Sequence, residues 1–470
     1  MGKKKVILLI MVLGLGLGIR IYKLPELMPF IGDQGWFYLS ARDMILNAQI
    51  PLVGITSSHT WLHQGPLWTY ILAFILWVSN FDPISGGVFT AILGVFTIFV
   101  IYKVGSRMFS EKVGIISSIL YATSPLIIDF DRTPYHTSPI PFFVLLLFFT
   151  VYKWIKGKRI FFPISVFLLQ ILYNFELATQ VLWFALLFLL CYGILKKKIW
   201  AISLFKPKII ILSLLSFILP MLPVIIYDFT YGFSQTFKFM LWVPYRVLRQ
   251  FNLLNNFSSP IEGESFFFII AFLKRQYQRL IFMSNGFIAM AIFFASFISI
   301  FLFFLNKFKQ KHIIPIPLLI LFIFIIIPLI GLVVNKTPSE AYLPILFPTA
   351  ILVTGWLFSL GIKYKILTIP TIILLVFIAT SNLFSFLKSL ENQISYKTRL
   401  NISRKIVQQA QGKEYNLVGK GDGSQFRSFT MNYEYLAWWL GNEPSQKNEK
   451  LKFIIDESNN KIRLERKINF

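Results

Sequence analysis

A single carboxylate, Asp33, lies in an aromatic stretch near the start of the chain, FIGDQGWFYLSAR at residues 30–42. The stretch is too polar for the hydrocarbon region of a bilayer and too aromatic for an ordinary loop. A carboxylate that is partly buried, or crowded by other acids, holds a proton more tightly, so Asp33 could act as a general base near neutral pH. Asp33 could also be the N-cap of the helix predicted to follow it, and the two roles are compatible.

The composition of the 470-residue chain sets the kind of scaffold that positions Asp33: 56% of the residues are hydrophobic and only 14% are charged. Soluble domains contain about 25% charged residues and rarely have repeated apolar runs of about 20 residues. The sequence therefore predicts an all-α polytopic membrane bundle. The single cysteine, Cys191, excludes an intramolecular disulfide and a zinc–cysteine cluster.

Eleven apolar runs predict eleven transmembrane helices, the first of them an uncleaved N-terminal span. A further apolar run at 66–81 is short and contains Trp68, Tyr70 and Trp77, which favour the headgroup layer. We expect this run to lie on the external surface, although a short twelfth span is the alternative. The expected spans are 6–24, 86–104, 113–130, 137–152, 160–174, 178–195, 209–226, 286–305, 313–333, 342–361 and 366–388.

The distribution of charge predicts the orientation. With the N-terminus in the cytoplasm and 66–81 outside, the cytoplasmic segments hold twenty basic residues and one acid, Glu111. This bias follows the positive-inside rule, so the net charge of +25 indicates membrane topology and no nucleic-acid partner. We expect a multi-pass protein of the plasma membrane. Its acids gather at the external ends of spans, where they would line a substrate site: Asp33, Asp129, Asp131, Glu176 and Glu340.

Two external segments are longer than a turn, 25–85 and 227–285, and the second is rich in basic and aromatic residues. Basic side chains at helical spacing beside apolar faces suit the phosphate of an anionic lipid. For any one of them, snorkelling from an interfacial helix is the simpler interpretation. The candidates for lipid-phosphate binding are Arg246, Arg249, Lys274, Arg275 and Arg279.

The chain divides at about residue 388, where apolar spans give way to a polar tail. Residues 1–388 form the predicted membrane domain, and 389–470 form a small α/β extramembrane domain on the external side. Within the tail, KLKFIID and KIRLERKI joined through Asn459 and Asn460 predict a β-hairpin. A helix is expected at MNYEYLAWWLG and a strand at YNLVG.

A metal site is an open alternative. His59 and His63 have the spacing of two ligands on one helix face, but a nearby Pro and Gly make that helix doubtful. Asp33 with Asp129 or Asp131 could also hold a divalent ion. Because a site needs three or four converging ligands, the sequence predicts no certain cofactor.

An acid on an interfacial loop beside basic aromatic helices suits a transferase that uses a lipid-phosphate-linked donor. A lipid phosphate leaves readily once its charge is stabilised, so the chemistry mainly needs a base for the acceptor hydroxyl. The rival class is a lipid-linked sugar transporter or flippase. The centres of the spans contain almost no charge and the sequence shows no repeat, which favours surface chemistry.

Four stretches, in order, resemble the GT-C glycosyltransferases, and in particular the protein mannosyltransferase and aminoarabinose transferase group. The resemblance spans most of residues 1–361, and the order of the short motifs carries it. The stretches are GDQGWFYLSARDM, HQGPLWTYIL, SPLIIDFDRTPYHTSPIPFF and SEAYLPILFP.

The resemblance implies an inverting transfer of a sugar from a polyprenyl-phosphate donor to a protein, lipid or glycan acceptor. Asp33 matches the catalytic acid of that group, and Arg132 matches its Arg at the outer end of the third span. Gln34 stands where a second acid is usual, which puts a two-carboxylate or metal mechanism in doubt. Three further residues would lie near the donor or acceptor: His63, Gln64 and His136, with Thr137 as an alternative to His136.

Overall fold

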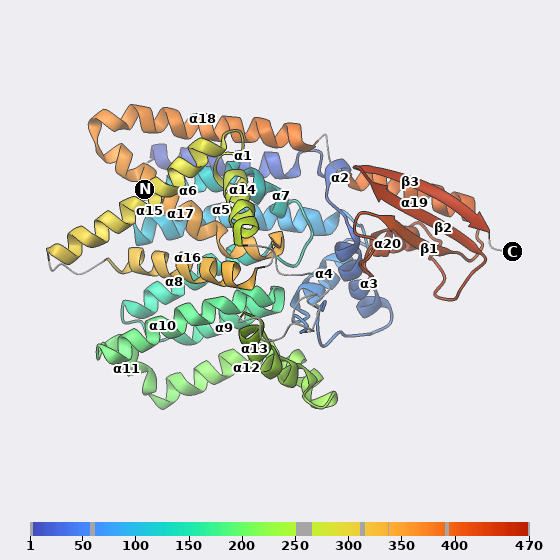
Figure 1. Ribbon diagram of the computed structural model, residues 1–470, viewed down its shortest axis with the longest axis horizontal. Helices are drawn as coiled ribbons and strands as arrows, with labels where there is room; N and C mark the ends of the chain where they lie inside the picture. Colours follow the sequence, from blue (N-terminus) through green and yellow to red (C-terminus); the bar gives the residue numbers. More distant parts are fainter. Residues whose placement is uncertain are drawn as a thin grey trace.

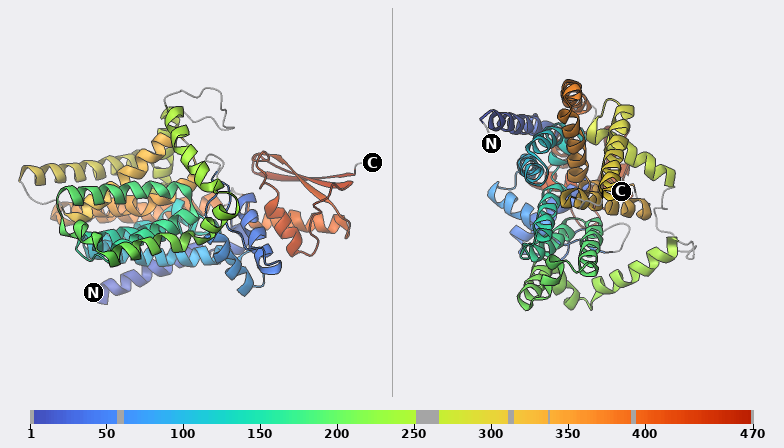
Figure 2. Two further views of the ribbon diagram at one scale, coloured as in Figure 1. Left: turned by 90° about the horizontal axis from the view of Figure 1, so that it is seen from below. Right: turned by 90° about the vertical axis from the view of Figure 1, so that its left-hand side faces the viewer.

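The computed structural model describes residues 3–56, 62–250, 266–310, 315–336, 338–390 and 394–468. Long helices run side by side in a bundle, and a small α/β unit lies beyond one end of it (Figure 1). The N-terminus lies far from this unit, toward the other end of the bundle, in Figure 1 and in the left-hand view of Figure 2. The prediction of a helical membrane bundle with a small α/β unit is confirmed.

Each expected span coincides with a helix. The bundle helices are α1 (Lys3–Ile21), α5 (Ser85–Met108), α6 (Glu111–Thr123) with α7 (Pro125–Asp131), α8 (Ile140–Ile155), α9 (Phe161–Phe175), α10 (Val181–Leu195), α12 (Pro207–Thr230), α15 (Gly286–Lys309), α16 (Ile316–Asn335), α17 (Phe347–Lys363) and α18 (Lys365–Ser389). Short 3₁₀ helices, η1 (Leu177–Gln180) and η3 (Glu340–Ile345), precede α10 and α17.

Length and composition divide these helices, apart from α1, into two groups. In the part of the chain that the structure describes, six helices are long and apolar enough to cross a membrane, or seven if the bent pair α6–α7 counts as one span. Four other apolar helices are shorter, among them α8, α9 and α17. The chain is a multi-pass membrane protein whose shorter helices lie among longer neighbours.

The third expected span is bent by 68° between α6 and α7. Pro125 begins α7, and because a proline has no N–H and clashes with the preceding turn, a straight helix cannot continue through it. Ser124 at the break donates a hydrogen bond to the carbonyl of Leu280 at 2.7 Å. The bend turns α7 away from the axis of α6. It therefore sets the direction of the chain at residues 129–136, which include predicted site residues.

Three helices cover the end of the bundle beside the α/β unit, which we call the docking end: α2 (Leu24–Leu27), α3 (Gly32–Leu46) and α4 (Leu67–Val78) (Figure 1). The helix α4 is the apolar run expected at the membrane surface. An α-helix rises about 1.5 Å per residue, so the 12 residues of α4 form a helix shorter than the hydrocarbon core of a bilayer, which is roughly 30 Å thick.

Two amphipathic helices follow α12, and short helices lie before it. The amphipathic pair is α13 (Ser234–Gln250) and α14 (Phe266–Ile281), whereas α11 (Ile199–Ile202) and the 3₁₀ helix η2 (Ser203–Phe205) come between α10 and α12. The carboxylate of Asp228 at the end of α12 accepts hydrogen bonds from the backbone N–H groups of Gln235 and Thr236, at 2.7 and 3.1 Å. These contacts fix the start of α13 against the end of α12.

The C-terminal unit combines two helices, α19 (Tyr396–Ala410) and α20 (Met431–Trp439), with a three-stranded sheet. Strand β1 (Asn416–Gly421) pairs in parallel with β2 (Leu451–Ser458), which pairs antiparallel with β3 (Lys461–Ile468). Asn459 and Asn460 have φ angles of 53° and 55°, as a tight hairpin turn requires. The predicted hairpin, helix and strand are all present.

Aromatic rings join the C-terminal unit to the docking end. The rings of Phe30 and Tyr38 meet edge to face at 5.0 Å, and Tyr38 meets Tyr435 of α20 at the same distance. Tyr396 of α19 lies 6.0 Å from Phe30. These side chains are almost completely buried, so the C-terminal unit shares a hydrophobic core with the membrane bundle.

Candidate active site

Asp33 lies in the first turn of α3, and its carboxylate accepts two hydrogen bonds from hydroxyl groups. Tyr135 donates to Oδ2 at 3.0 Å, and Ser428 of the C-terminal unit donates to Oδ1 at 2.6 Å. The side chain is partly exposed. Asp33 is therefore placed between the bundle and the C-terminal unit, oriented from both sides.

The start of α3 is fixed by Gln34 and not by Asp33. The Gln34 side-chain oxygen accepts a hydrogen bond from the backbone N–H of Ile31, which completes one half of a capping box. Gln34 stands where a second acid was expected. It is buried, and it caps the helix. Because Gln34 makes this contact, the Asp33 carboxylate is left to bind side-chain hydroxyls.

A second polar cluster consists of Gln64, His136 and Glu176, three residues that the sequence places near the substrate. The Nε2 of His136 lies 3.3 Å from Glu176 Oε2, and the Gln64 amide donates to the same oxygen at 3.1 Å. All three side chains are buried. Glu176 was expected at the external end of a span, and the structure shows it buried at the break between α9 and η1.

The Asp33 pair and the second cluster are neighbours because Tyr135 and His136 are consecutive residues. Their rings lie 4.1 Å apart, and Phe37 of α3 lies 5.1 Å from the His136 ring. In the described part of the chain, the buried Nδ1 of His136 has no hydrogen-bond partner. Two carboxylates, an imidazole and a phenol therefore occupy one region at the docking end.

His63 lies at the edge of this region, held mainly through its backbone. Gln235 of α13 receives a hydrogen bond from His63 N at 3.2 Å and donates one to His63 O at 2.6 Å. The His63 ring nitrogen Nδ1 lies 3.1 Å from the carbonyl of Gly54. Burial lowers the pKa of His63, which favours a neutral ring. The two hydrogen bonds with Gln235 of α13 therefore fix the backbone of His63, the residue next to Gln64.

A third cluster joins α7, α14 and η3. Arg279 donates to Asp129 at 2.9 Å and to Glu340 at 3.0 Å, and the Gln276 amide donates to the same Glu340 oxygen at 2.9 Å. The structure therefore brings together three predicted site residues, Asp129, Arg279 and Glu340. The guanidinium of Arg279 is engaged by carboxylates on both sides.

Asp131 and Arg132 lie in a different place, against the end of α1. The carboxylate of Asp131 accepts hydrogen bonds from Arg20, and Arg132 donates from Nη1 to the carbonyls of Ile19, Arg20 and Tyr22 at 2.8 to 3.1 Å. Both side chains are buried. These contacts tie α7 to the C-terminal end of α1.

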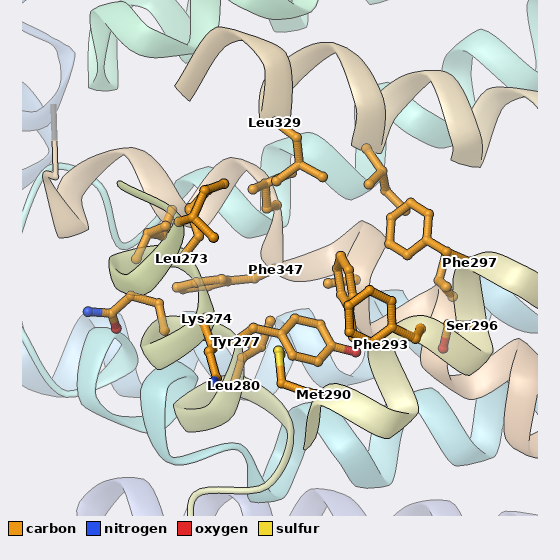
Figure 3. A pocket seen from close by; sticks show the side chains of 18 of the residues that line it. Leu273, Lys274, Tyr277, Leu280, Met290, Phe293, Ser296, Phe297, Leu329 and Phe347 are labelled. Carbon is orange, nitrogen blue, oxygen red and sulfur yellow. The ribbon is translucent and has the colours of Figure 1, made fainter. Parts of the chain in front are cut away.

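The remaining basic candidates lie on α13 and α14. Lys274 and Arg275 are exposed on α14, whereas Arg246 and Arg249 lie on α13 with side chains outside what the structure describes. Lys274 borders an apolar cavity of ≈ 570 Å³ between α14, α15, α16 and α17 (Figure 3). The lining includes Leu126, Leu273, Tyr277, Phe293, Phe297, Leu329 and Phe347.

The expected metal alternatives find little support in the arrangement of ligands. Among the residues that the structure describes, no group of three or more His, Cys, Asp or Glu side chains could hold a metal ion. His59 lies outside the described residues. Asp33, Asp129 and Asp131 each have separate hydrogen-bond partners.

Two residues of this region, Tyr135 and Ser428, were missed by the sequence reasoning. Tyr135 adjoins the predicted His136, and its place in a Pro-rich stretch was a usable signal. Ser428 lies in a polar segment of the tail, and nothing local in the sequence connects it to Asp33. Their contacts emerge only when α7 and the C-terminal unit are both placed.

Comparisons with known proteins agree with this architecture. A family model described as dolichyl-phosphate-mannose-protein mannosyltransferase matches residues 63–227. The structure is similar to ArnT from Cupriavidus metallidurans bound to undecaprenyl phosphate, with a TM-score of 0.62 and 10% identity, covering 97% of this chain and 93% of that one. The apo state of the same enzyme gives a TM-score of 0.57 at 11% identity, covering 95% and 92%. A search of curated proteins found no match.

The structure is also similar to the archaeal oligosaccharyltransferase AglB from Archaeoglobus fulgidus, in complex with an inhibitory peptide and a dolichol-phosphate. The TM-score is 0.58 at 12% identity, covering 93% of this chain but only 64% of that one, so this chain spans less than two thirds of AglB. The chain shares the GT-C membrane fold of these glycosyltransferases. The resemblance predicted from the four sequence motifs is confirmed.

Proposed function

We propose that this protein transfers a sugar from a polyprenyl-phosphate donor to an acceptor hydroxyl on the external face of the plasma membrane, with inversion of configuration and with Asp33 as the general base. The observations that carry the proposal are the Asp33 carboxylate, which two hydroxyls hold, and an apolar cavity of the bundle that has a lysine at its border. Such a cavity suits a lipid tail, and the polar region around Asp33 suits a sugar.

The cavity and the polar region are connected through α7 and the residues that follow it. Leu126, in the first turn of α7, lines the cavity, whereas Tyr135, a short distance along the chain, donates a hydrogen bond to Asp33. The ring of Phe130 meets Phe347, another lining residue, at 5.3 Å. A donor whose tail lies in the cavity would thus have its sugar close to Asp33.

Lys274 is the best candidate for the donor phosphate among the described basic residues. It borders the cavity and is exposed, so its three N–H donors are available to an anionic oxygen. Arg279 is already bound by Asp129 and Glu340, and would need to leave one of them. We therefore assign the phosphate contact to Lys274. Arg279 instead holds Asp129 and Glu340 in place.

In the proposed reaction, the acceptor oxygen attacks the anomeric carbon as its proton passes to Asp33. The bond between that carbon and the phosphate oxygen breaks, and the electron pair stays on the lipid phosphate. The products are a glycosylated acceptor and a polyprenyl phosphate. Glu176, with His136 and Gln64, would bind sugar hydroxyls.

Two solved structures of similar fold support the donor class. ArnT is bound to undecaprenyl phosphate and AglB to a dolichol-phosphate with a peptide, so proteins of this fold bind lipid phosphates. For this chain the donor sugar and the acceptor, a protein, lipid or glycan, are open. Residues 389–470 are proposed as an external domain and 1–388 as the membrane domain.

Membranes containing the protein, supplied with a polyprenyl-phosphate-linked radiolabelled sugar, test the proposal. Wild type should release the sugar from lipid, and Asp33→Asn, which keeps the size and removes the base, should not. A transporter or flippase would move the labelled lipid between leaflets equally well in both forms, without release. Glu26→Asn serves as the control, since Glu26 is an exposed acid near the same end, and its loss should leave transfer unchanged.

A further inference from the structure

One hydroxyl that holds Asp33 comes from outside the membrane bundle. Ser428 lies in the C-terminal unit, between β1 and α20, and donates to Asp33 Oδ1 at 2.6 Å. Tyr135 donates to the other oxygen at 3.0 Å. Because each carboxylate oxygen is engaged by a different part of the chain, the plane of the carboxylate is fixed by both parts together.

The segment around Ser428 is pressed against α3 at two glycines. A Cβ at Gly32 would lie 2.1 Å from the Ser428 carbonyl oxygen, and a Cβ at Gly35 would lie 2.1 Å from the Asn432 backbone nitrogen. The Asn432 amide donates to the carbonyl of Phe30 at 2.8 Å. The absence of side chains at these two positions permits the backbone of the C-terminal unit to reach the turn of α3 that carries Asp33.

Contacts farther from Asp33 hold the unit in this position. Tyr435 donates to the carbonyl of Phe81 at 2.8 Å, and Arg42 pairs with Glu443 at 2.7 Å while lying 5.0 Å over the ring of Trp438. These contacts and the buried aromatic rings also dock the unit. The hydroxyl of Ser428 contacts Asp33 directly, so its placement bears on the orientation of that carboxylate.

We propose that Ser428 is a positioning residue and that the C-terminal unit thereby completes the active site. A general base must present a lone pair in line with the acceptor proton, opposite the leaving group. With one hydrogen bond on each oxygen, each oxygen of Asp33 still has a second lone pair, and the two hydroxyls decide where it points. This inference rests on the proposed transferase function.

Purified full-length protein in detergent or nanodiscs, assayed with a polyprenyl-phosphate sugar and its acceptor, tests the inference. Ser428→Ala should lower kcat roughly ten- to hundredfold, as expected when a reacting group is slightly misaligned, with the donor KM unchanged. Ser428→Thr, which keeps a hydroxyl, should restore most of kcat. The matched control is Ser458→Ala, which removes a hydroxyl of the same unit that contacts Asp456.

A second pair keeps the test decisive if Ser428→Ala does not accumulate. Threonine and valine have nearly the same shape, so Ser428→Thr and Ser428→Val differ mainly in the hydroxyl. If the Val form keeps the kcat of the Thr form, the hydroxyl does not position Asp33. If removing the hydroxyl raises kcat, then Ser428 hinders Asp33 from acting as the base. This result would also overturn the inference.

The outcome for Asp33 separates this inference from the proposed function. An inactive Asp33→Asn together with wild-type kcat in Ser428→Ala refutes the positioning role and leaves the transferase in place. Full activity in Asp33→Asn removes the base, and both proposals fail with it. Loss of kcat in both variants, with rescue by Ser428→Thr, supports both.

Discussion

The guanidinium of Arg20 at the end of α1 binds the carboxylate of Asp131 at the end of α7, with both the Nε and Nη2 nitrogens 2.8 Å from the same oxygen, Oδ2. Both side chains are almost completely buried, and a Cβ at Gly94 would lie 2.4 Å from that oxygen. The pair fixes α7 against α1. It therefore determines the direction in which the chain enters the region of Tyr135 and His136.

We expect Asp131→Leu to destabilise the protein strongly, because it leaves the guanidinium of Arg20 buried and uncompensated. Breaking a buried pair from one side costs about 3–5 kcal/mol. Thermal unfolding in detergent should show a large decrease in Tm. The double variant Arg20→Met/Asp131→Leu should recover much of it, and Glu111→Gln, which breaks the exposed pair with Lys5, should change nothing measurable. A double variant as unstable as the single one would contradict this account.

Glu176→Gln should reduce transfer without unfolding the protein. Glutamine keeps the size of the side chain and its hydrogen bond to the Ala178 backbone, but it loses the negative charge beside His136. If the cluster binds sugar hydroxyls, the donor KM should rise about tenfold, the effect of one good hydrogen bond of about 1.4 kcal/mol. Steady-state kinetics measure this change, with Glu26→Gln as the control. An unchanged KM and kcat would exclude Glu176 from the site.

Lys274→Ala should weaken donor binding and also lower kcat, because the lysine contacts the donor phosphate before transfer and stabilises the charge that grows on it as it leaves. The donor KM is expected to rise by about one to two orders of magnitude, the range for a hydrogen bond to a charged group. Arg275→Ala is the matched control, since the neighbouring residue is also exposed on α14 but does not line the cavity. Equal effects at the two positions would indicate a general interfacial charge and no specific phosphate site.

The parts of this fold that follow from local patterns could be predicted from the sequence. Apolar runs placed a helix at each expected span, and strand alternation with Asn459 and Asn460 placed the hairpin. The proline itself was a signal for the bend at Pro125. The hydropathy pattern obscured it, because the apolar run continues through the proline. A proline within an apolar run thus has to be considered separately from the length of the run.

The pairings that build the site depend on tertiary structure and leave no local trace. Asp131 was expected to meet substrate, yet its partner is Arg20, a residue from the first helix. The contact between Asp33 and Ser428 joins the two ends of the chain and needs the C-terminal unit docked on α3. Polar residues at helix ends indicate where a site lies, but which of them pair with each other is decided by packing.

The orientation of the chain can be tested with single cysteines, because Cys191 is the only natural one and can be replaced by Ser. Lys413→Cys lies at an exposed position of the C-terminal unit, and Lys363→Cys lies at an exposed position at the end of α17. The excess of basic residues around Lys363 predicts a cytoplasmic location for it by the positive-inside rule. A membrane-impermeant maleimide added to intact cells should label position 413 and leave position 363 unlabelled until the membrane is permeabilised. The reverse pattern would put Asp33 on the cytoplasmic side, since Ser428 of the same unit contacts it, and would rule out transfer on the external face.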